Sequence, residues 1–565
     1  GSQPLKYPSA AAGDVVEKLH GVEIADPYRW LEDEQSPQVQ AWVAAQNRLT
    51  HDTLARFSAL REQITRDLDA IYGVDSVSNY VPRGSRFFQM KREKLENHAK
   101  LLVREGDYRA EPRVVLDPNT FSTDGTVALD WWYPSPDGAF VAYGKSSGGS
   151  EKSTLYVRDV ATGRDLPESI PFTQYCGVAW NPDSSGFFYN RCPDPATVPN
   201  GEENFHMRVY FHQIGTPWQQ DRYIWGEGRP KDEEPRPYLS SDRKWVLLNF
   251  YQDPAKNDLY IKSAEDTEPF QPVAAGLDAI TTGDAVDGRL FLRTNYQAPR
   301  FRICTATVDK PRPEDWRELV PQQKGVISDV EIVDRKLIVH VSEDVHSRLF
   351  VYDLDGKLLE EIALPGVGTV TSYLPGIGTV TAFSGALDNP GLFFTFSSWV
   401  VPTAAYRYDL RTRQLEKLAE TDCPVDLSKY ETRQIWCTSK DGTRVPVFVV
   451  ARRDVKLDGN NPALLYGYGG FNSSFFPYYR PRIIPFLERG GVWALANIRG
   501  GGEFGQPWHD GGRRECKQNC FDDFYAAAEE LIRLGYTNPK KLACRGGSNG
   551  GLLIAAAVVQ RPDLF

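Results

Sequence analysis

A repeating pattern of short apolar runs occupies the middle of the chain and constrains its fold more than any other feature. The runs are rich in aromatic and β-branched residues and begin near Phe87, Phe140, Phe187, Trp245, Leu290, Leu337 and Leu392, at intervals of 45 to 58 residues. Several follow a turn signal such as Ser135-Pro136-Asp137-Gly138, and several precede a second hairpin. Two hairpins in about 50 residues make one four-stranded propeller blade. We therefore expect residues 71–428 to form a seven-bladed β-propeller. A pair of β-sandwiches is the alternative, but it does not explain a sustained period.

The segment before the repeats is predicted to be helical. From Val39 to Leu60 apolar residues recur at helical spacing, with polar residues on the other face. Ser36-Pro37 provides an N-cap followed by a proline in the first turn. We expect one covering helix within residues 1–70.

The segment after the repeats, residues 429–565, is typical of an α/β domain. Apolar strand candidates are Val445–Val450, Ala463–Tyr466, Val492–Ile498 and Leu542–Cys544. A helix is expected from Phe521 to the stop signal at Gly535, with Asp522 and Asp523 in its first turn, where they complement the helix dipole. Strands that alternate with helices predict a mostly parallel sheet.

The strongest chemical signal is Gly546-x-Ser548-x-Gly550, which lies between a predicted strand and an apolar helix. In this context the pattern predicts a nucleophile elbow, because the two glycines leave room for a tight turn that exposes the serine hydroxyl. The backbone N–H of Asn549 is then placed to receive an oxyanion. A glycine-rich turn with an incidental serine is the alternative.

A second oxyanion donor is expected in the loop after an earlier strand. The segment "ALLYGYGGFN" supplies a strand, three glycines and Tyr468, whose phenol is an O–H donor. Phe471 in the same loop is a candidate wall of an apolar side-chain pocket, although ordinary packing explains it equally well. The glycines of "NIRGGGEFG" at 497–505 match neither nucleotide-binding pattern, so we exclude nucleotide binding.

A serine nucleophile requires a base and an orienting acid, which in this fold class follow the serine along the chain. The 17 residues after Ser548 contain Asp563 but no histidine. His509 is the histidine of this region, and it precedes the serine, so a surface or loop position is the better interpretation for it. We expect the chain to be a fragment, or to work with a separate piece that holds the rest of the triad.

Composition excludes several classes of protein. The charge is −10, from 65 Lys and Arg against 75 Asp and Glu, which argues against a binder of nucleic acid or anionic membranes. Apolar runs are too short for a membrane span. The eight cysteines include one close pair, Cys516 and Cys520, with no second pair to complete a metal site. We expect no metal or cofactor, a monomer, and a reducing cytoplasmic location. A periplasmic or secreted location is the alternative, because Gly1-Ser2 is typical of a tag remnant that would hide a removed signal peptide.

The chain resembles the prolyl oligopeptidase family over essentially its whole length. The motifs that carry the resemblance are "DPYRWLED" at 26–33, "YGYGGFN" at 466–472, "NIRGGGEFG" at 497–505, "KQNCFDDF" at 517–524 and "GGSNGGLL" at 546–553. The resemblance implies an α/β-hydrolase domain, incomplete here, with an inserted seven-bladed propeller. It also implies that residues 1–70 pack on the hydrolase domain and that 429–565 form its N-terminal part.

The same resemblance implies the roles of individual residues. Ser548 matches the family nucleophile, Tyr468 and the backbone of Asn549 match the oxyanion hole, and Phe471 matches an aromatic of the proline pocket. Tyr175 is a loose match to a propeller aromatic that touches longer peptides. The catalytic aspartate and histidine fall beyond Phe565.

The expected function is a serine endopeptidase that cuts short, proline-containing oligopeptides after proline, with the propeller restricting entry to short chains. A peptide macrocyclase of the same family is one alternative, in which an amine instead of water takes the acyl group. A catalytically incomplete peptide-binding fragment is the other.

Overall fold

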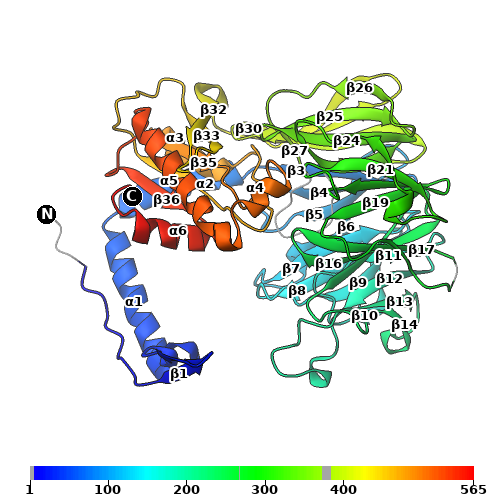
Figure 1. Cartoon of the computed structure of the whole chain (residues 1–565), viewed down its shortest axis with the longest axis horizontal. Helices are drawn as coiled ribbons and strands as arrows, with labels where there is room; N and C mark the ends of the chain where they lie inside the picture. The colour runs from blue at the N-terminus through cyan, green and yellow to red at the C-terminus, as the bar shows by residue number, and fades with distance from the viewer. Residues whose placement is uncertain (1–4, 266, 372–382) are drawn as a thin grey trace. The chain divides into compact units, whose positions relative to one another are not determined.

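The chain is described by a computed structural model that covers residues 5–265, 267–371 and 383–565 (Figure 1). It divides into two compact units, residues 1–70 and 71–565. Among the residues described, no helix combines the length and the apolar character that crossing a membrane requires.

The first unit holds a small hairpin and the predicted helical segment. Strands β1 (Val16–Leu19) and β2 (Val22–Ala25) pair antiparallel. Helix α1 (Pro37–Ala55) begins directly after Ser36, as predicted, and α2 (Ser58–Tyr72) follows it. The prediction of one continuous helix is wrong, because the backbone N–H groups of Arg56 and Phe57 bond three residues back instead of four, which tightens the turn and ends α1.

Seven antiparallel sheets follow along the chain, and each is built from consecutive strands. The first three blades are β3 (Ser76–Arg83), β4 (Arg86–Arg92), β5 (Lys100–Glu105) and β6 (Arg113–Leu116); β7 (Val127–Pro134), β8 (Phe140–Ser147), β9 (Thr154–Asp159) and β10 (Arg164–Ile170); and β11 (Val178–Trp180), β12 (Gly186–Arg191), β13 (Arg208–Gln213) and β14 (Arg222–Trp225). The next three blades are β15 (Glu234–Leu239), β16 (Trp245–Asp253), β17 (Lys256–Ser263) and β18 (Gln271–Ala274); β19 (Thr281–Val286), β20 (Arg289–Thr294), β21 (Arg302–Thr307) and β22 (Arg317–Val320); and β23 (Val326–Val333), β24 (Lys336–Glu343), β25 (His346–Asp353) and β26 (Leu358–Ile362).

The seventh blade is β27 (Thr369–Thr371), β28 (Phe383–Ala386), β29 (Asn389–Ser398), β30 (Val401–Asp409) and β31 (Gln414–Glu420). Strands β27 and β28 both pair with β29, at successive positions along one edge, so together they take the place of a first strand in this blade. The seven-bladed propeller predicted from the sequence is confirmed.

The ring closes where the first blade meets the last. Strand β3 lies against β28, β29 and β30, and in the described part of the chain no strand of one blade joins the sheet of another. Side chains hold this seam: Asn79 donates from Nδ2 to Ser384 Oγ at 3.2 Å and to the Phe393 carbonyl at 3.1 Å, and the rings of Tyr80 and Phe393 stack at 5.7 Å.

The C-terminal part of the second unit is a mixed five-stranded sheet with helices on both faces. Its strands are β32 (Tyr430–Thr438), β33 (Arg444–Arg452), β34 (Ala463–Tyr466), β35 (Val492–Ala496) and β36 (Leu542–Arg545), in the order β32-β33-β35-β34-β36. Its helices are α3 (Ile484–Glu488), α4 (Gln506–Asp510), α5 (Lys517–Arg533) and α6 (Asn549–Gln560). Strands β34, β35 and β36 are parallel, as the α/β pattern predicts.

Successive side chains of a strand point to opposite faces of the sheet, which explains why the sheet lies between two layers of helices. Val447 and Val449 of β33 face the cluster that contains Phe524 of α5, whereas Phe448 and Val450 face the cluster that contains Leu487 of α3. Both faces of the sheet are therefore buried, which explains the continuous apolar runs of the central strands. The arrangement is that of an α/β-hydrolase sheet.

Helix α5 begins earlier than the sequence predicts. It starts at Lys517, so Asp522 and Asp523 do not lie in its first turn, and the prediction that they complement the helix dipole is wrong. Asp523 is instead fully buried and forms an ion pair with Arg499. The positive backbone angle of Gly535, φ 80°, follows the end of the helix as expected.

Candidate active site

Ser548 stands in the sharp turn between β36 and α6. Its side chain is exposed, and its backbone angles are φ 53° and ψ −121°. A residue with a Cβ in this region of backbone space costs about 1–3 kcal/mol and persists only where the surroundings enforce it. The surroundings do so by close approach: a Cβ on Gly546 would overlap the Gly550 backbone, and one on Gly550 would lie 2.8 Å from the Gly467 carbonyl oxygen. The predicted strand–turn–helix context is therefore present.

The loop after β34 meets this turn because β34 and β36 are parallel neighbours whose carboxyl ends share one sheet edge. Asn549 donates from Nδ2 to the Tyr468 carbonyl at 2.8 Å. Gly470 has no room for a side chain, since a Cβ there would overlap the Asn549 amide. The structure thus brings Tyr468, Ser548 and Asn549 together, as the sequence predicts. We call residues 467–475 the oxyanion loop, after the role that the sequence predicts for Tyr468.

Phe471 presents its ring to solvent from this loop. It is 58% exposed, and both Phe471 and Asn472 have positive φ, 53° and 54°. The next residue ties the loop to the propeller, because Asn472 donates from Nδ2 to the carbonyl of Pro254 at 3.2 Å, in the turn between β16 and β17. An exposed aromatic ring on a strained, anchored backbone is available to pack against a ligand.

His509 supports the loop and is not on the surface. It is 4% exposed in α4, and its Nδ1 lies 2.7 Å from the Gly500 carbonyl oxygen and 3.1 Å from the Asn472 nitrogen. The expectation of a surface or loop histidine is therefore wrong. Burial lowers the pKa of His509, which favours the neutral ring in contact with these backbone groups.

Lys517 and Cys520 at the start of α5 are further supports that sequence reasoning missed. Lys517 donates from Nζ to the Gly469 carbonyl at 2.7 Å, and the Cys520 thiol lies 3.4 Å from the same oxygen. Burial raises the pKa of Cys520 to about 11, so its thiol is not a nucleophile at neutral pH. The motif "KQNCFDDF" contains both residues, but no spacing rule relates it to a loop nearly 50 positions upstream.

Arg499 fixes the neighbouring loop after β35. Its guanidinium forms two-pronged ion pairs with Asp523 and with Asp441, and its backbone N–H donates to Asp523 Oδ2 at 2.9 Å. Arg499 and Asp523 are buried, and the hydrogen bonds from Arg499 hold the pKa of Asp441 well below its usual range. Breaking one partner of such a buried pair leaves an uncompensated charge, so this network anchors the loop firmly.

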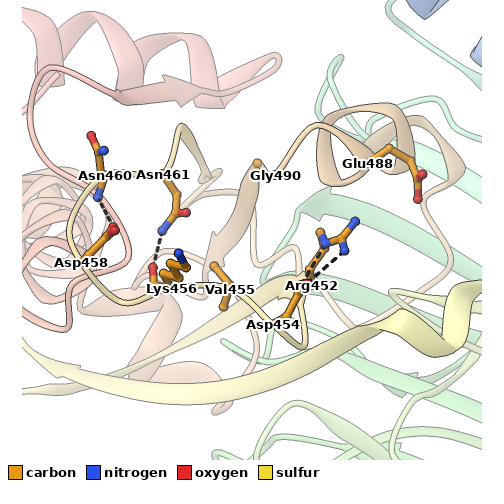
Figure 2. Close-up of a pocket in the computed structure, with 10 residues that line it drawn as sticks. Arg452, Asp454, Val455, Lys456, Asp458, Asn460, Asn461, Glu488 and Gly490 are labelled. Carbon is orange, nitrogen blue, oxygen red and sulfur yellow. Dashed lines mark hydrogen bonds and ion pairs between the residues drawn. The ribbon is translucent and has the colours of Figure 1, made fainter.

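A separate polar pocket lies at the opposite edge of the sheet (Figure 2). It has a volume of about 350 Å³ and is lined by the end of β33, the loop before β34 and the turn before β35. Arg452 pairs with Asp454 at 2.9 Å, and Asn461 donates to the Lys456 carbonyl at 2.7 Å. These groups satisfy one another, and the amino ends of the parallel strands β34 and β35 face this pocket, so it is not the candidate active site.

The site has three of the parts that acyl transfer uses: an exposed hydroxyl at a helix N-terminus, a backbone N–H beside it, and a phenol in the adjoining loop. Among the described residues, no group of three or more His, Cys, Asp or Glu could hold a metal ion.

Tyr175 lies on the propeller, between β10 and β11. It is 43% exposed, and its hydroxyl donates to Glu151 Oε2 at 2.6 Å.

Comparison with known protein families gives two matches. Residues 7–421 match the family model of the prolyl oligopeptidase N-terminal β-propeller domain, and residues 477–565 match that of the prolyl oligopeptidase family.

Individual relatives agree with these matches. The prolyl endopeptidase of Elizabethkingia miricola is 33% identical over all of this chain and 78% of its own length. A dual function macrocyclase-peptidase of Galerina marginata is 29% identical over 99% of this chain and 80% of its own. A solved structure from a mechanistic study of two prolyl endopeptidases superposes with a TM-score of 0.92 at 37% identity, over 99% of this chain and 81% of that one.

Proposed function

The chain belongs to the prolyl oligopeptidase family, and on that premise we propose that Ser548 is the nucleophile of a serine endopeptidase that cleaves short peptides after proline. The observation that carries the assignment is the junction of the serine turn with the oxyanion loop, made by the 2.8 Å bond from Asn549 to the Tyr468 carbonyl. It supports the proposal because it brings Ser548, Asn549 and Tyr468 to one sheet edge.

The proposed reaction uses these groups in order. Ser548 Oγ attacks the prolyl carbonyl carbon, and the negative charge that develops on the carbonyl oxygen is stabilised by the Asn549 N–H and the Tyr468 O–H. The carbon–nitrogen bond then breaks, the proton from the hydroxyl leaves on the departing amine, and water hydrolyses the acyl-enzyme. The exposed ring of Phe471 offers an apolar face to the proline ring of the substrate.

A change at Tyr468 tests this assignment in the full-length protein. Tyr468→Phe removes one oxygen and leaves the ring contact with Phe475, so folding should be unaffected. The expected result is a fall in kcat of about 10- to 10³-fold with little change in KM, because the lost hydrogen bond strengthens as charge develops. A kcat within twofold of the unmodified enzyme would show that Tyr468 is not an oxyanion donor.

Cyclisation is the second candidate, because relatives named macrocyclase-peptidase share about 29% identity with this chain. In that reaction the amino terminus of the bound peptide takes the acyl group instead of water. Mass spectrometry of the products of a linear, proline-containing peptide distinguishes the two outcomes: a cyclic product is lighter than the hydrolysed one by one water. We expect the hydrolysed product.

We further propose a monomeric enzyme in a reducing, cytoplasmic compartment. All eight cysteines are free, and five of them are buried. A chain that folds without disulfides suits such a compartment. We also propose the division into residues 1–70, 71–428 and 429–565. Light scattering and cell fractionation test the first two statements, and limited proteolysis tests the domain division.

A further inference from the structure

A buried carboxylate lies behind the oxyanion loop. Glu503 is 3% exposed, in the loop after β35, and its Oε1 accepts hydrogen bonds from the Phe475 backbone N–H at 3.1 Å and from Asn497 Nδ2 at 3.1 Å. Asn497 is 1% exposed and donates through the same Nδ2 to the Phe475 carbonyl at 2.7 Å. Both backbone groups of Phe475 are therefore held by these two side chains.

The ring of Phe475 packs against Tyr468, the proposed oxyanion donor, and so restricts its movement. Its ring centroid lies 5.1 Å from that of Tyr468, with 41° between the planes, and 5.8 Å from that of Tyr466. The position of the Tyr468 hydroxyl depends on two side-chain torsions, and a fixed aromatic wall restricts both. An oxyanion donor must be aimed before the reaction, because reorientation during the reaction costs the energy that the donor would supply.

Burial of the Glu503 carboxylate is unfavourable for the stability of the fold. Oε2 of Glu503 is buried and has no hydrogen-bond partner in the described structure, and neither contact of Oε1 is to a cation. Burying a carboxylate without a counter-charge destabilises a fold, and a neutral amide would accept the same two hydrogen bonds. Groups kept at such a cost concentrate at functional sites.

We propose that Glu503 and Asn497 are positioning residues for the oxyanion hole, which clamp Phe475 and thereby hold the Tyr468 hydroxyl toward the developing oxyanion. This inference rests on the proposed role of Tyr468. Glu503 and Asn497 touch neither the substrate nor the reacting atoms. They act through the ring of Phe475, which packs against Tyr468.

The experiment uses four variants of the full-length enzyme and a chromogenic prolyl peptide. Glu503→Leu removes the acceptor, and Glu503→Gln retains it. Phe475→Leu removes the aromatic wall, and Glu488→Gln is the control, a surface carboxyl paired with Lys429. We expect Glu503→Leu and Phe475→Leu each to lower kcat about tenfold with KM within about twofold. Glu503→Gln and the control should keep at least half of kcat.

A double-mutant cycle with Tyr468→Phe separates positioning from a general loss of structure. If Glu503 acts through Tyr468, then Glu503→Leu lowers kcat by no more than about twofold in the Tyr468→Phe background. An equal loss in both backgrounds, or Glu503→Gln as impaired as Glu503→Leu, overturns the inference and leaves the proposed function intact. If Glu503→Leu does not fold, the same double-mutant cycle is made with Phe475→Leu and Tyr468→Phe. Phe475→Leu should then lower kcat by no more than about twofold in the Tyr468→Phe background. A Tyr468→Phe enzyme with normal kcat overturns the oxyanion assignment, and the inference falls with it.

Discussion

Replacing Glu503 by glutamine should stabilise the protein above neutral pH. Burial raises the pKa of Glu503 from its ordinary value of 4.5 to about 7. Each factor of ten in proton affinity is worth about 1.36 kcal/mol, so deprotonating this group in the folded state costs about 3 kcal/mol relative to the unfolded chain.

The sign of the pH dependence follows from the direction of the shift. Below pH 4.5 the carboxyl is protonated in both states, so it makes no difference to stability there. Between pH 4.5 and about 7 the folded state retains a proton that the unfolded state has lost, and the free energy of unfolding falls as the pH rises. Above pH 7 the full cost of about 3 kcal/mol is present. Glutamine cannot ionise, so Glu503→Gln removes this dependence.

The assay is urea unfolding of the two proteins at pH 5 and at pH 8, followed by tryptophan fluorescence. The variant should exceed the unmodified protein in stability by about 3 kcal/mol at pH 8, and by much less at pH 5. Glu488→Gln, in which the altered side chain is 33% exposed, controls for the loss of a surface charge. A difference between Glu503→Gln and the unmodified protein that does not change with pH, or a variant that is less stable at pH 8, would refute the reasoning.

Two further changes test other parts of the structure. Burial alone would lower the pKa of His212, but the 2.8 Å hydrogen bond to Asp221 and the nearby carboxylate of Glu168, at 3.8 Å, outweigh it and raise the pKa to about 9. The stabilisation is therefore complete below about pH 6.5 and is lost as the pH rises through about 9. His212→Gln should lower the melting temperature at about pH 7 and flatten its fall toward about pH 9.5, and an unchanged slope would contradict this. Gly470→Ala should lower kcat about tenfold, because the new Cβ displaces the Asn549 amide. Gly551→Ala is the control and should keep kcat, because its Cβ meets nothing within 4 Å. Equal activities of the two variants would contradict the close approach of Gly470 to Asn549.

The propeller could be predicted because one strand of each blade carries a strong signal. Each of the seven predicted runs falls on the second strand of a blade, β4, β8, β12, β16, β20, β24 or β29. A second strand has a neighbour on each side within its sheet and a blade above and below, so its side chains are buried on both faces, as in β12 and β16. The outer strands expose half of their residues and show no comparable run, as in β10 and β22.

Other elements gave no usable pattern in the sequence. Strands β1 and β2 are exposed almost throughout, and β32 mixes buried and exposed positions without a regular period. Because strand prediction relies on burial, such edge elements are invisible to it. The start of α5 was misplaced for a related reason: the buried ion pair of Asp523 with Arg499 joins residues that are distant in sequence.

One part of the candidate site could be predicted from the sequence and another part could not. The serine turn is a local motif, and its glycines, its strand and its helix were all predictable from adjacent residues. The supports of the oxyanion loop are not local. Glu503, His509 and Lys517 each bond to backbone groups nearly 30 positions or more upstream, so only the fold reveals what they hold.

The central claim is that Ser548 is the nucleophile, and active-site labelling tests it most directly. The full-length protein would be treated with a fluorophosphonate, digested, and examined by mass spectrometry, alongside a Ser548→Ala variant and a turnover assay with a prolyl peptide. The account predicts one adduct, on the peptide that contains Ser548, together with no adduct and no turnover in the folded variant. An adduct on a different serine, or turnover that survives Ser548→Ala, would contradict it.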